Sequence, residues 1–437
     1  MQGILQDSSP EETIDIRALD RKIWWRIIPF VVVLYVISIL DRVNIGYAAL
    51  TMNADLGIDP FLYGLIAGIF FVSYVLFEVP SNQILARAGA RVWLCRIMVS
   101  WGIIAILMAA VRTPVELGIL RFLLGAAEAG FAPGLILYLS FWFRKTEIAK
   151  ALAVFFIAIP LAMVIASPVS AFILSHGTWF SVAGWRWLFI LEGLPAIILG
   201  FAILIVLPDF PEKAAWILPS EKTWLSARLE GVQVQARATW AIPFRQLVMT
   251  PEIPLLCMSA FLVGLFLTGL LFWIPRIVQV SGLSGSFTDT GLLVMIPYTI
   301  SAIAMYAWSR HSDLREERRR HVAIPFVIAS AFLFLLSAFH EPLPGFLFLT
   351  GAITACYAAY APFFAITIEA FPQDLRAGGI ALVNTVASVG AFLGPVLFGL
   401  AGGRIDSYLA TGLFLVLGGS LTCCAVLLVY RNVVPEP

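Results

Sequence analysis

The sequence predicts an all-α protein that crosses a lipid bilayer twelve times, in two halves of six helices each. Of its 437 residues, 60% are hydrophobic and only 13% are charged, with a mean hydropathy of +0.93. Soluble globular proteins carry about 25% charged residues. Apolar runs of about 20 residues, long enough to cross ~30 Å of hydrocarbon as a helix, recur along the chain. The composition therefore excludes a soluble protein and indicates a polytopic membrane protein.

Twelve apolar runs have the length and composition of membrane spans. One long polar stretch separates the sixth run from the seventh. We therefore expect an N-terminal segment (1–23), a first bundle (24–207), a central loop (208–253), a second bundle (254–430) and a tail (431–437). Two such halves are typical of transporters built from repeats, whose binding site lies at the interface between them. The expected spans are 24–49, 61–82, 92–111, 115–142, 150–175, 186–207, 254–280, 289–310, 322–340, 344–367, 378–402 and 408–430.

The basic residues predict the orientation of the chain. If the amino terminus is cytoplasmic, 22 of the 28 Lys and Arg residues fall in cytoplasmic segments, four fall outside, and Arg42 and Arg121 lie within spans. Cytoplasmic loops of membrane proteins carry such an excess of basic residues. We expect both termini and the central loop in the cytoplasm of a cell whose inner (plasma) membrane holds the protein. The net charge of +1 gives no indication of a nucleic-acid partner.

The first expected span, 24–49, carries two adjacent charges, Asp41 and Arg42, inside its apolar run. A charged side chain at the bilayer centre costs roughly 2.5–3.5 kcal/mol on insertion scales, so such side chains face a polar cavity or a partner. These two residues therefore indicate a functional site. The alternative is an ion pair at the end of a helix, next to the membrane surface.

The fourth expected span, 115–142, is the stretch around which we expect the site to form. It carries Arg121 and Glu128, and seven residues at ~100° each place both on one face of a helix. Gly125 and Ala132 would open space beside them. We interpret this face as one wall of a wet central cavity. The alternative is an ion pair that only holds two helices together.

The four buried charges suggest a mechanism because Asp41, Arg42, Arg121 and Glu128 sum to zero. An entering monoanion would add an uncompensated negative charge, which one proton on Asp41 or Glu128 would remove. Protonation would also free an arginine for a two-point contact with a substrate carboxylate. We therefore expect Asp41 and Glu128 to couple transport to protons, and Arg42 and Arg121 to bind the substrate.

Further candidate binding residues are polar or aromatic. Tyr74 lies in the second expected span and could donate a hydrogen bond to a substrate. The second half has no charge in the middle of a span, but it offers Tyr360, Phe364, Asn384 and Ser388, which would shape the pocket. The alternative for all five is packing, because polar side chains in membrane helices also hydrogen-bond neighbouring helices.

Two loops are candidates for gates between conformations. Arg87, Gly89 and Arg91 form a tight basic turn after the second span, and Asp313 follows the eighth span in a corresponding position. The chain shows no residues at metal-ligand spacing, no nucleophile beside a base and no sizeable soluble domain. We therefore expect a transporter, not an enzyme, without a metal or cofactor, and acting as a monomer.

Five segments of the chain resemble a known family: LDRVNIGYAALTMNADLG (40–57), FEVPSNQILARAGARVWL (77–94), RFLLGAAEAGFAPG (121–134), GWRWLFILEGLPA (184–196) and the loop at 312–313. On them the chain resembles the major facilitator superfamily and, within it, the anion:cation symporter family. The first three segments are most similar to bacterial tartrate, phthalate and hydroxyphenylacetate permeases.

The resemblance implies two pseudo-symmetric six-helix bundles, alternating access and proton-driven import of organic anions. By position in the family's motifs, Asp41 and Glu128 match its proton-binding carboxylates. Arg42 and Arg121 match its coupling and carboxylate-binding arginines. Tyr74 and Asn384, both already candidates for substrate binding, match substrate contacts of the family.

Three departures from the family pattern bear on the substrate. Asn82 and Ala86 stand where the superfamily has Gly and Asp, so its usual gating salt bridge must be rearranged. Ile159 stands where sugar-acid transporters have a polar amide, and 361–364 lacks their indole. Fewer donors favour a small dicarboxylate or an aromatic carboxylate over a polyhydroxylated sugar acid. Proton-driven efflux and anion exchange of an organic acid remain the alternative functions.

Overall fold

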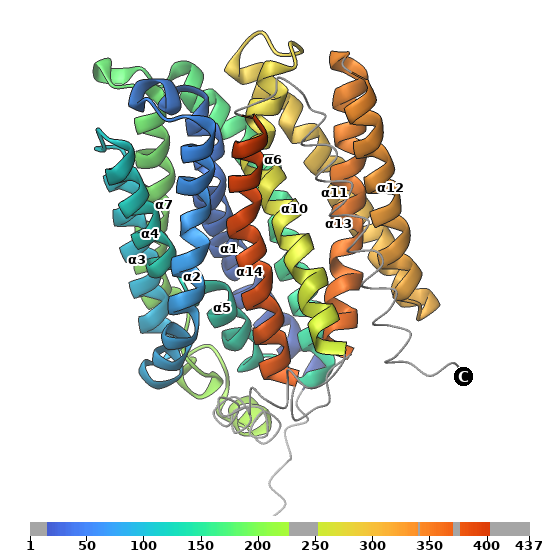
Figure 1. Ribbon diagram of the computed structural model, residues 1–437. Coiled ribbons are helices and arrows are strands. Elements are labelled where there is room, and N and C mark those ends of the chain that lie inside the picture. The colour runs from blue at the N-terminus through green and yellow to red at the C-terminus, as the bar shows by residue number, and fades with distance from the viewer. Residues whose placement is uncertain (1–14, 227–251, 340, 370–375, 403–437) are drawn as a thin grey trace, which may run out of the picture.

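The computed structural model describes residues 15–226, 252–339, 341–369 and 376–402. The axes of its long helices all run in roughly the same direction (Figure 1). Eleven helical spans in this described part are long and apolar enough to cross a membrane, and no strand occurs in it. The prediction of an all-α membrane protein is confirmed. The twelfth expected span, 408–430, lies outside the described residues, as do the tail and 227–251 of the central loop.

The first bundle holds the first six spans, and its helices begin and end at predictable residues. Asp15 caps the first helix by accepting hydrogen bonds from the next turn, and Gly57 ends it in the left-handed conformation. Asp59 caps the second helix and Pro60 begins it. The helices are α1 (Ile16–Leu56), α2 (Pro60–Ala88), α3 (Ala90–Met108), α4 (Pro114–Glu128), α5 (Phe131–Ser140), α6 (Lys145–His176) and α7 (Gly184–Val206).

The second bundle holds the next five spans. Ser286 caps its second helix and Glu316, in the left-handed conformation, ends that helix. The helices are α10 (Glu252–Val280), α11 (Phe287–Arg315), α12 (Arg319–Ala338), α13 (Pro342–Glu369) and α14 (Arg376–Gly402). Two single turns of 3-10 helix, η1 (Trp179–Ser181) and η2 (Pro211–Lys213), flank α7.

The fourth span is broken, where the sequence predicted one helix over 115–142. Ala129 leaves the helical conformation (φ −53°, ψ 130°) and Gly130 is left-handed (φ +84°), so α4 ends at Glu128. A Cβ on Gly130 would approach the Ser81 hydroxyl of α2 to 2.6 Å. Irregular backbone at membrane depth is tolerated where protein buries it. Glycine at 130 permits both the left-handed backbone and the close approach of α2, and the break places Glu128 at a helix terminus.

The two bundles meet along α2 with α14 and along α6 with α11, and α14 lies beside α2 in Figure 1. Small residues make the first contact possible: a Cβ on Gly64 or Gly68 would collide with the backbone of α14, at Pro395 and Phe392. Backbones that approach this closely are typical of helix pairs in membranes.

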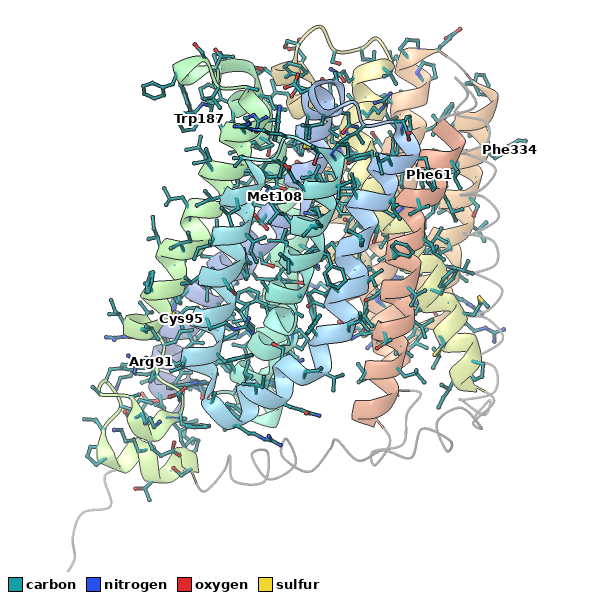
Figure 2. The ribbon with its side chains drawn as sticks, turned by 60° about the vertical axis from the view of Figure 1, so that its left-hand side comes forward. Phe61, Arg91, Cys95, Met108, Trp187 and Phe334 are labelled. Carbon is teal, nitrogen blue, oxygen red and sulfur yellow. The ribbon has the colours of Figure 1, made fainter. Side chains whose placement is uncertain are left out.

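The contacts between the bundles gather at the end that contains Gly57. There the Tyr63 hydroxyl donates to the Phe272 carbonyl oxygen at 3.0 Å, and the Ser175 and Thr288 hydroxyls lie 2.9 Å apart. Figure 2 shows Phe61 at this end and Arg91 at the opposite end. We refer to these as the Gly57 end and the Arg91 end. The bundles are closed on each other at the Gly57 end.

Candidate functional site

The buried charges of the described chain gather in the first bundle. Asp41 and Arg121 are 0% exposed and Glu128 is 1% exposed. Arg42 is more open, with 18% of its side chain exposed. A further acid, Glu192 in α7, is 5% exposed. In the described part of the second bundle, no Asp, Glu, Lys or Arg side chain is buried, and His321 at the start of α12 is the one buried histidine. The two bundles therefore differ in buried charge.

Glu128 forms an ion pair with Arg42, and its Oε1 atom also accepts a hydrogen bond from the Ser38 hydroxyl at 2.8 Å. Because α4 ends at Glu128, this carboxylate lies at the negative end of a helix dipole, where an anion is unfavourable. The Arg42 guanidinium and the Ser38 hydroxyl offset that cost. A proton on Glu128 would weaken the ion pair and release Arg42.

Arg121 has no hydrogen-bond partner in the structure, although all three of its side-chain nitrogens are buried. Asp41, Tyr63 and Glu128 lie within electrostatic range of it. Asp41 is the acid expected to balance it, but its Oδ1 atom accepts only a long hydrogen bond from Asn44, at 3.4 Å, and its Oδ2 atom has no partner. An unpaired buried guanidinium is costly, and it fits a site that binds an anion.

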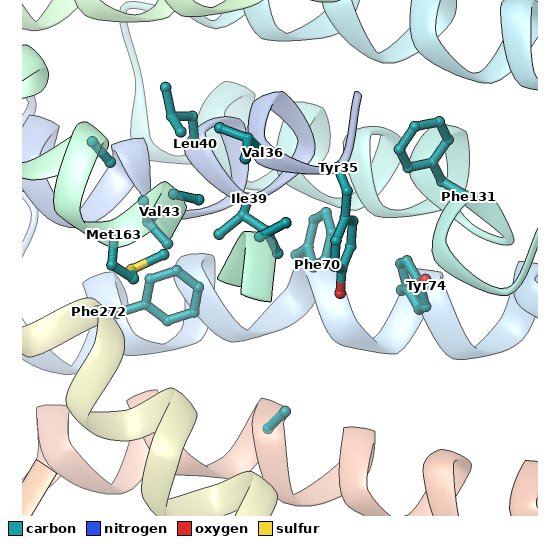
Figure 3. Close-up of a cluster of buried hydrophobic side chains, with 14 of the residues drawn as sticks. Tyr35, Val36, Ile39, Leu40, Val43, Phe70, Tyr74, Phe131, Met163 and Phe272 are labelled. Atoms are coloured by element: carbon teal, nitrogen blue, oxygen red, sulfur yellow. The ribbon is translucent and has the colours of Figure 1, made fainter. Parts of the chain in front are cut away.

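An aromatic cluster lies against both arginines. The Arg42 guanidinium lies 5.2 Å from the centre of the Phe70 ring and 5.3 Å from that of Tyr74. The Arg121 guanidinium lies 5.2 Å from the same Phe70 ring. Figure 3 shows Phe70 and Tyr74 along α2, with Tyr35 of α1 nearby. Cation–π attraction thus holds two like charges near one ring.

Two candidates from the second bundle lie together on α13, on one side of this group. Tyr360 on α13 lies within electrostatic range of Tyr35 and Arg42, across the interface between the bundles. Its ring packs against Phe364, with the ring centres 4.8 Å apart. The structure therefore brings Tyr360 and Phe364 to the side of the site that Arg42 occupies.

The other two candidates of the second bundle lie on α14. Asn384 and Ser388 are half-buried, and the Ser388 hydroxyl donates to the Asn384 carbonyl oxygen at 3.0 Å. This hydrogen bond lies within one helix, and within the described chain no hydrogen bond joins either side chain to the arginines. Their expected role in substrate binding stays a prediction.

The basic turn at the Arg91 end is hydrogen-bonded to the start of the central loop. Gly89 is left-handed (φ +92°), and the Arg91 backbone N–H donates to Asp209 Oδ1 at 3.0 Å. Lys213 lies 3.3 Å from the other oxygen of Asp209. Arg87 is exposed in the last turn of α2. Asp209 thus ties this basic turn to the start of the central loop.

The corresponding turn of the second bundle is stabilised by interactions among its own residues. Asp313 forms an ion pair with Arg318, which also donates to the Ser312 hydroxyl at 3.1 Å. The Ser312 hydroxyl in turn donates to the Glu317 carbonyl oxygen at 2.8 Å. Asp313 therefore holds the turn between α11 and α12.

Two expectations about space around the site are wrong. Gly125 does not open a cavity, because α2 packs directly against it: a Cβ there would collide with the Phe70 carbonyl oxygen and the Ser73 hydroxyl. The side chains expected to line a wet cavity, Arg121 and Glu128, are enclosed in this conformation. A glycine leaves room that a neighbouring helix can fill, and the sequence does not show which helix does so.

Sequence reasoning also missed residues that belong to this buried group. Glu192 lies in the middle of the sixth expected span, so the cost of burying a charge would have identified it as it identified Arg121. With Glu192 included, the buried group contains three acids and two bases, and the predicted neutral sum becomes −1. Ser38, Phe70 and Asn44 carry no such signal, because hydroxyl, aromatic and amide side chains are common in membrane helices.

Comparison with known proteins identifies a family profile and several similar transporters. The family profile described as Major Facilitator Superfamily matches residues 31–395. A protein of Agrobacterium vitis, provisionally named a tartrate transporter, is 38% identical over 421 residues, which cover 95% of each chain. A protein of Acinetobacter baumannii named a quinolone resistance transporter is 33% identical over 380 residues, which cover 87% of each chain.

Solved structures show the same fold. An inward-facing, unoccupied bacterial homologue of the human lysosomal transporter Spinster matches with a TM-score of 0.75 at 16% identity, over 95% of this chain and 99% of that chain. The proteins that this chain matches are transporters. The predictions of family, fold and a transporter as opposed to an enzyme are therefore confirmed.

Proposed function

We propose that this chain, which belongs to the Major Facilitator Superfamily, is a proton-coupled symporter that imports a small organic carboxylate. It would act by alternating access in a bacterial inner membrane, with both termini in the cytoplasm, as the excess of basic residues on that side supports. The observation that carries the proposal is Arg121, a fully buried guanidinium whose three nitrogens have no hydrogen-bond partner.

Arg121 and Arg42 provide the means of recognising a carboxylate. A guanidinium offers N–H donors in a planar fork that matches the two oxygens of a carboxylate. Arg121 has these donors unused, and Arg42 would gain them when its pair with Glu128 breaks. Tyr360 brings a hydroxyl from the second bundle to the Arg42 side. A dicarboxylate such as tartrate, with one carboxylate for each arginine, fits this arrangement best.

The Arg42–Glu128 pair provides the means of coupling. Substrate and Glu128 would compete for the same guanidinium, and Glu128 without its partner would lie as a bare anion at the end of α4. A proton on Glu128 removes that cost. Binding of substrate and binding of a proton would therefore each favour the other, which is the thermodynamic requirement for symport.

The interface between the bundles would open and close to expose the site to each side of the membrane in turn. The bundles are closed at the Gly57 end, where Tyr63 of α2 donates to Phe272 of α10. Tyr63 also lies within electrostatic range of Arg121. In the opposite conformation these contacts would separate and the Arg91 end would close. Because Tyr63 lies between the charged group and the closed end, occupancy of Arg121 would act directly on this closure.

Uptake into proteoliposomes tests the proposal. The purified full chain would be reconstituted, an inward proton gradient imposed, and radiolabelled tartrate, phthalate, hydroxyphenylacetate and galactonate tested with and without a protonophore. Accumulation of tartrate or an aromatic carboxylate that the protonophore abolishes is the expected result. Equilibration that is indifferent to the protonophore would contradict symport and reduce Asp41 and Glu128 to structural partners of the arginines.

A second candidate function, proton-driven efflux, is favoured by the relative of Acinetobacter baumannii named a quinolone resistance transporter. The same charged group could exchange a proton for a cytoplasmic organic acid. Proteoliposomes loaded with a fluoroquinolone and given a proton gradient from outside to inside would distinguish the two. Proton-dependent loss of the fluoroquinolone, without accumulation of any carboxylate, would replace import by efflux.

A further inference from the structure

Glu192 is a buried acid that the proposed mechanism does not use. It lies near the middle of α7 and is 5% exposed. Its Oε1 atom accepts a hydrogen bond from the Ser170 hydroxyl of α6 at 2.7 Å, and its Oε2 atom is buried without a partner. Ser170 itself is 0% exposed. The carboxyl group is therefore held in place by the fold while one of its oxygens remains unsatisfied.

Asn44 connects Glu192 to Asp41. The Asn44 amide is fully buried in α1, one turn after Asp41, and its Nδ2 atom donates to Asp41 Oδ1. Asn44 also lies within hydrogen-bonding reach of Glu192. Its own Oδ1 atom has no partner. Asp41 Oδ2 and Glu192 Oε2 are also buried without a donor. Carboxylate oxygens can only accept, so a proton on one of the two acids would supply the missing donor.

No basic side chain balances Glu192 among the described residues around it. From α1, Asp41 and Tyr47 face it, and from α6 it meets the Ser170 hydroxyl. On the side of α3, the backbones approach closely at Gly102 and Gly193, and the neighbouring side chains are apolar. A buried carboxyl group in such surroundings is neutral, because an unpaired buried charge costs far more than binding a proton.

We propose that Asp41 and Glu192 form a second proton-binding site, which holds one shared proton when no substrate is bound. With the proton on Glu192, its O–H donates to Asn44 Oδ1 while Asn44 Nδ2 donates to ionised Asp41. With the proton on Asp41, Asn44 Nδ2 can donate to ionised Glu192. The first of these arrangements gives Glu192 Oε2 and Asn44 Oδ1 a partner, and in both the proton stays within the first bundle.

The site changes the charge balance of the buried group. Asp41, Glu128 and Glu192 against Arg42 and Arg121 give −1, and the shared proton brings the sum to zero. The role of the site in transport rests on the proposed proton coupling, because a substrate monoanion would then need a second proton, on Glu128. The presence of the proton itself does not depend on transport.

Infrared spectroscopy of the full chain in lipid bilayers, without substrate, tests for the shared proton. The wild-type minus Glu192→Gln difference spectrum should contain the carbonyl stretch of a protonated carboxyl group, sensitive to deuterium and shifted by isotope-labelled glutamate. Asp41→Asn should weaken this band, because Glu128 and Glu192 then balance Arg42 and Arg121 without the shared proton. Glu341→Gln, at an exposed loop residue, serves as the matched control and should change nothing in this region.

A band that persists in Glu192→Gln, or that does not respond to labelled glutamate, would overturn the proposal. Ser170→Ala provides a second test in case Glu192→Gln misfolds, because it removes one hydrogen bond and keeps the acid. It should shift the band to higher frequency, and an unchanged band in Ser170→Ala would also count against the proposal.

The pH dependence of tartrate counterflow gives a second test. If Glu192 had only a structural role, Glu192→Gln would not change this pH dependence. Raising the pH removes the shared proton from the wild type, and the added negative charge lowers substrate affinity. Glu192→Gln removes that titration, so its affinity should fall at least tenfold less across the alkaline range. An identical alkaline profile overturns the proposal. Absence of counterflow for every carboxylate tested would contradict the proposed function, while the infrared result would still stand.

Discussion

The two bundles share one architecture but differ in the chemistry of their interiors. The first encloses Asp41, Arg121, Glu128 and Glu192, with Arg42 half-enclosed beside them. The second, over its described residues, fills the same depth with apolar, aromatic and hydroxyl side chains. The bundles are packed alike: a Cβ on Gly125 would collide with the Phe70 carbonyl oxygen, and one on Gly390 with that of Phe261.

This difference separates two tasks that one transporter must perform. Buried charges are costly and need fixed partners, so they are best kept in one rigid bundle. The second bundle can then move against the first without breaking ion pairs. Its contribution to the site, through Tyr360, is a neutral polar group that can approach and leave at low cost. The variants below test this division of labour.

Glu128→Gln should have the largest effect, because the amide mimics the protonated acid permanently. One pH unit of gradient supports about tenfold accumulation per coupled proton, and we expect this accumulation to be lost completely. Exchange of labelled for unlabelled tartrate across the membrane should continue, since it needs no net proton movement. Both are measured in proteoliposomes.

Loss of exchange together with accumulation would contradict this assignment and give Glu128 a structural role. Glu341→Gln, in the second bundle and exposed, is the control and should accumulate tartrate like the wild type.

Arg121→Lys should come next. A lysine keeps the charge but cannot reproduce the planar fork, and a charge-assisted hydrogen bond is worth ~1.5–3 kcal/mol, or roughly 10- to 150-fold in affinity. The apparent affinity for tartrate, measured by counterflow, should fall by that factor. Arg276→Lys, at an exposed arginine of α10, should bind normally. Equal affinity of both variants with the wild type would remove Arg121 from the site.

Phe70→Leu should have an intermediate effect. It removes the ring that faces both arginines, and cation–π contacts contribute ~0.5–2 kcal/mol each. We expect roughly 2- to 30-fold weaker tartrate binding from displaced guanidiniums. Phe266→Leu, at a buried ring of α10, should reduce the melting temperature similarly and leave binding unchanged. If both variants bind alike, Phe70 acts only in packing.

Ser388→Ala should have the smallest effect. Its hydroxyl hydrogen-bonds its own helix, and hydrogen bonds of this kind in membrane proteins average ~0.6 kcal/mol. We expect a loss of about that size in the free energy of unfolding and almost no change in tartrate affinity. A loss of affinity comparable to that of Arg121→Lys would show that the second bundle binds substrate through α14, and would weaken the contrast between the bundles.

The sequence by itself determined the class of the protein and the position of its buried charges. Apolar runs long enough to cross a bilayer can form only helices there, because backbone groups in lipid must pair within the segment. Asp41, Arg42, Arg121 and Glu128 were identifiable because a charge inside such a run needs a partner. Glu192, inside the sixth apolar run, carries the same signal.

The tertiary structure decided which of these charges are partners. Helical periodicity assigns a residue to a face of its own helix, and it carries no information about which helix lies opposite or at what depth. The pairing of Glu128 with Arg42, the isolation of Arg121, and the position of Asn44 between Asp41 and Glu192 all depend on contacts between helices. The break before Gly130, which places Glu128 at a helix end, lies where α2 approaches closely.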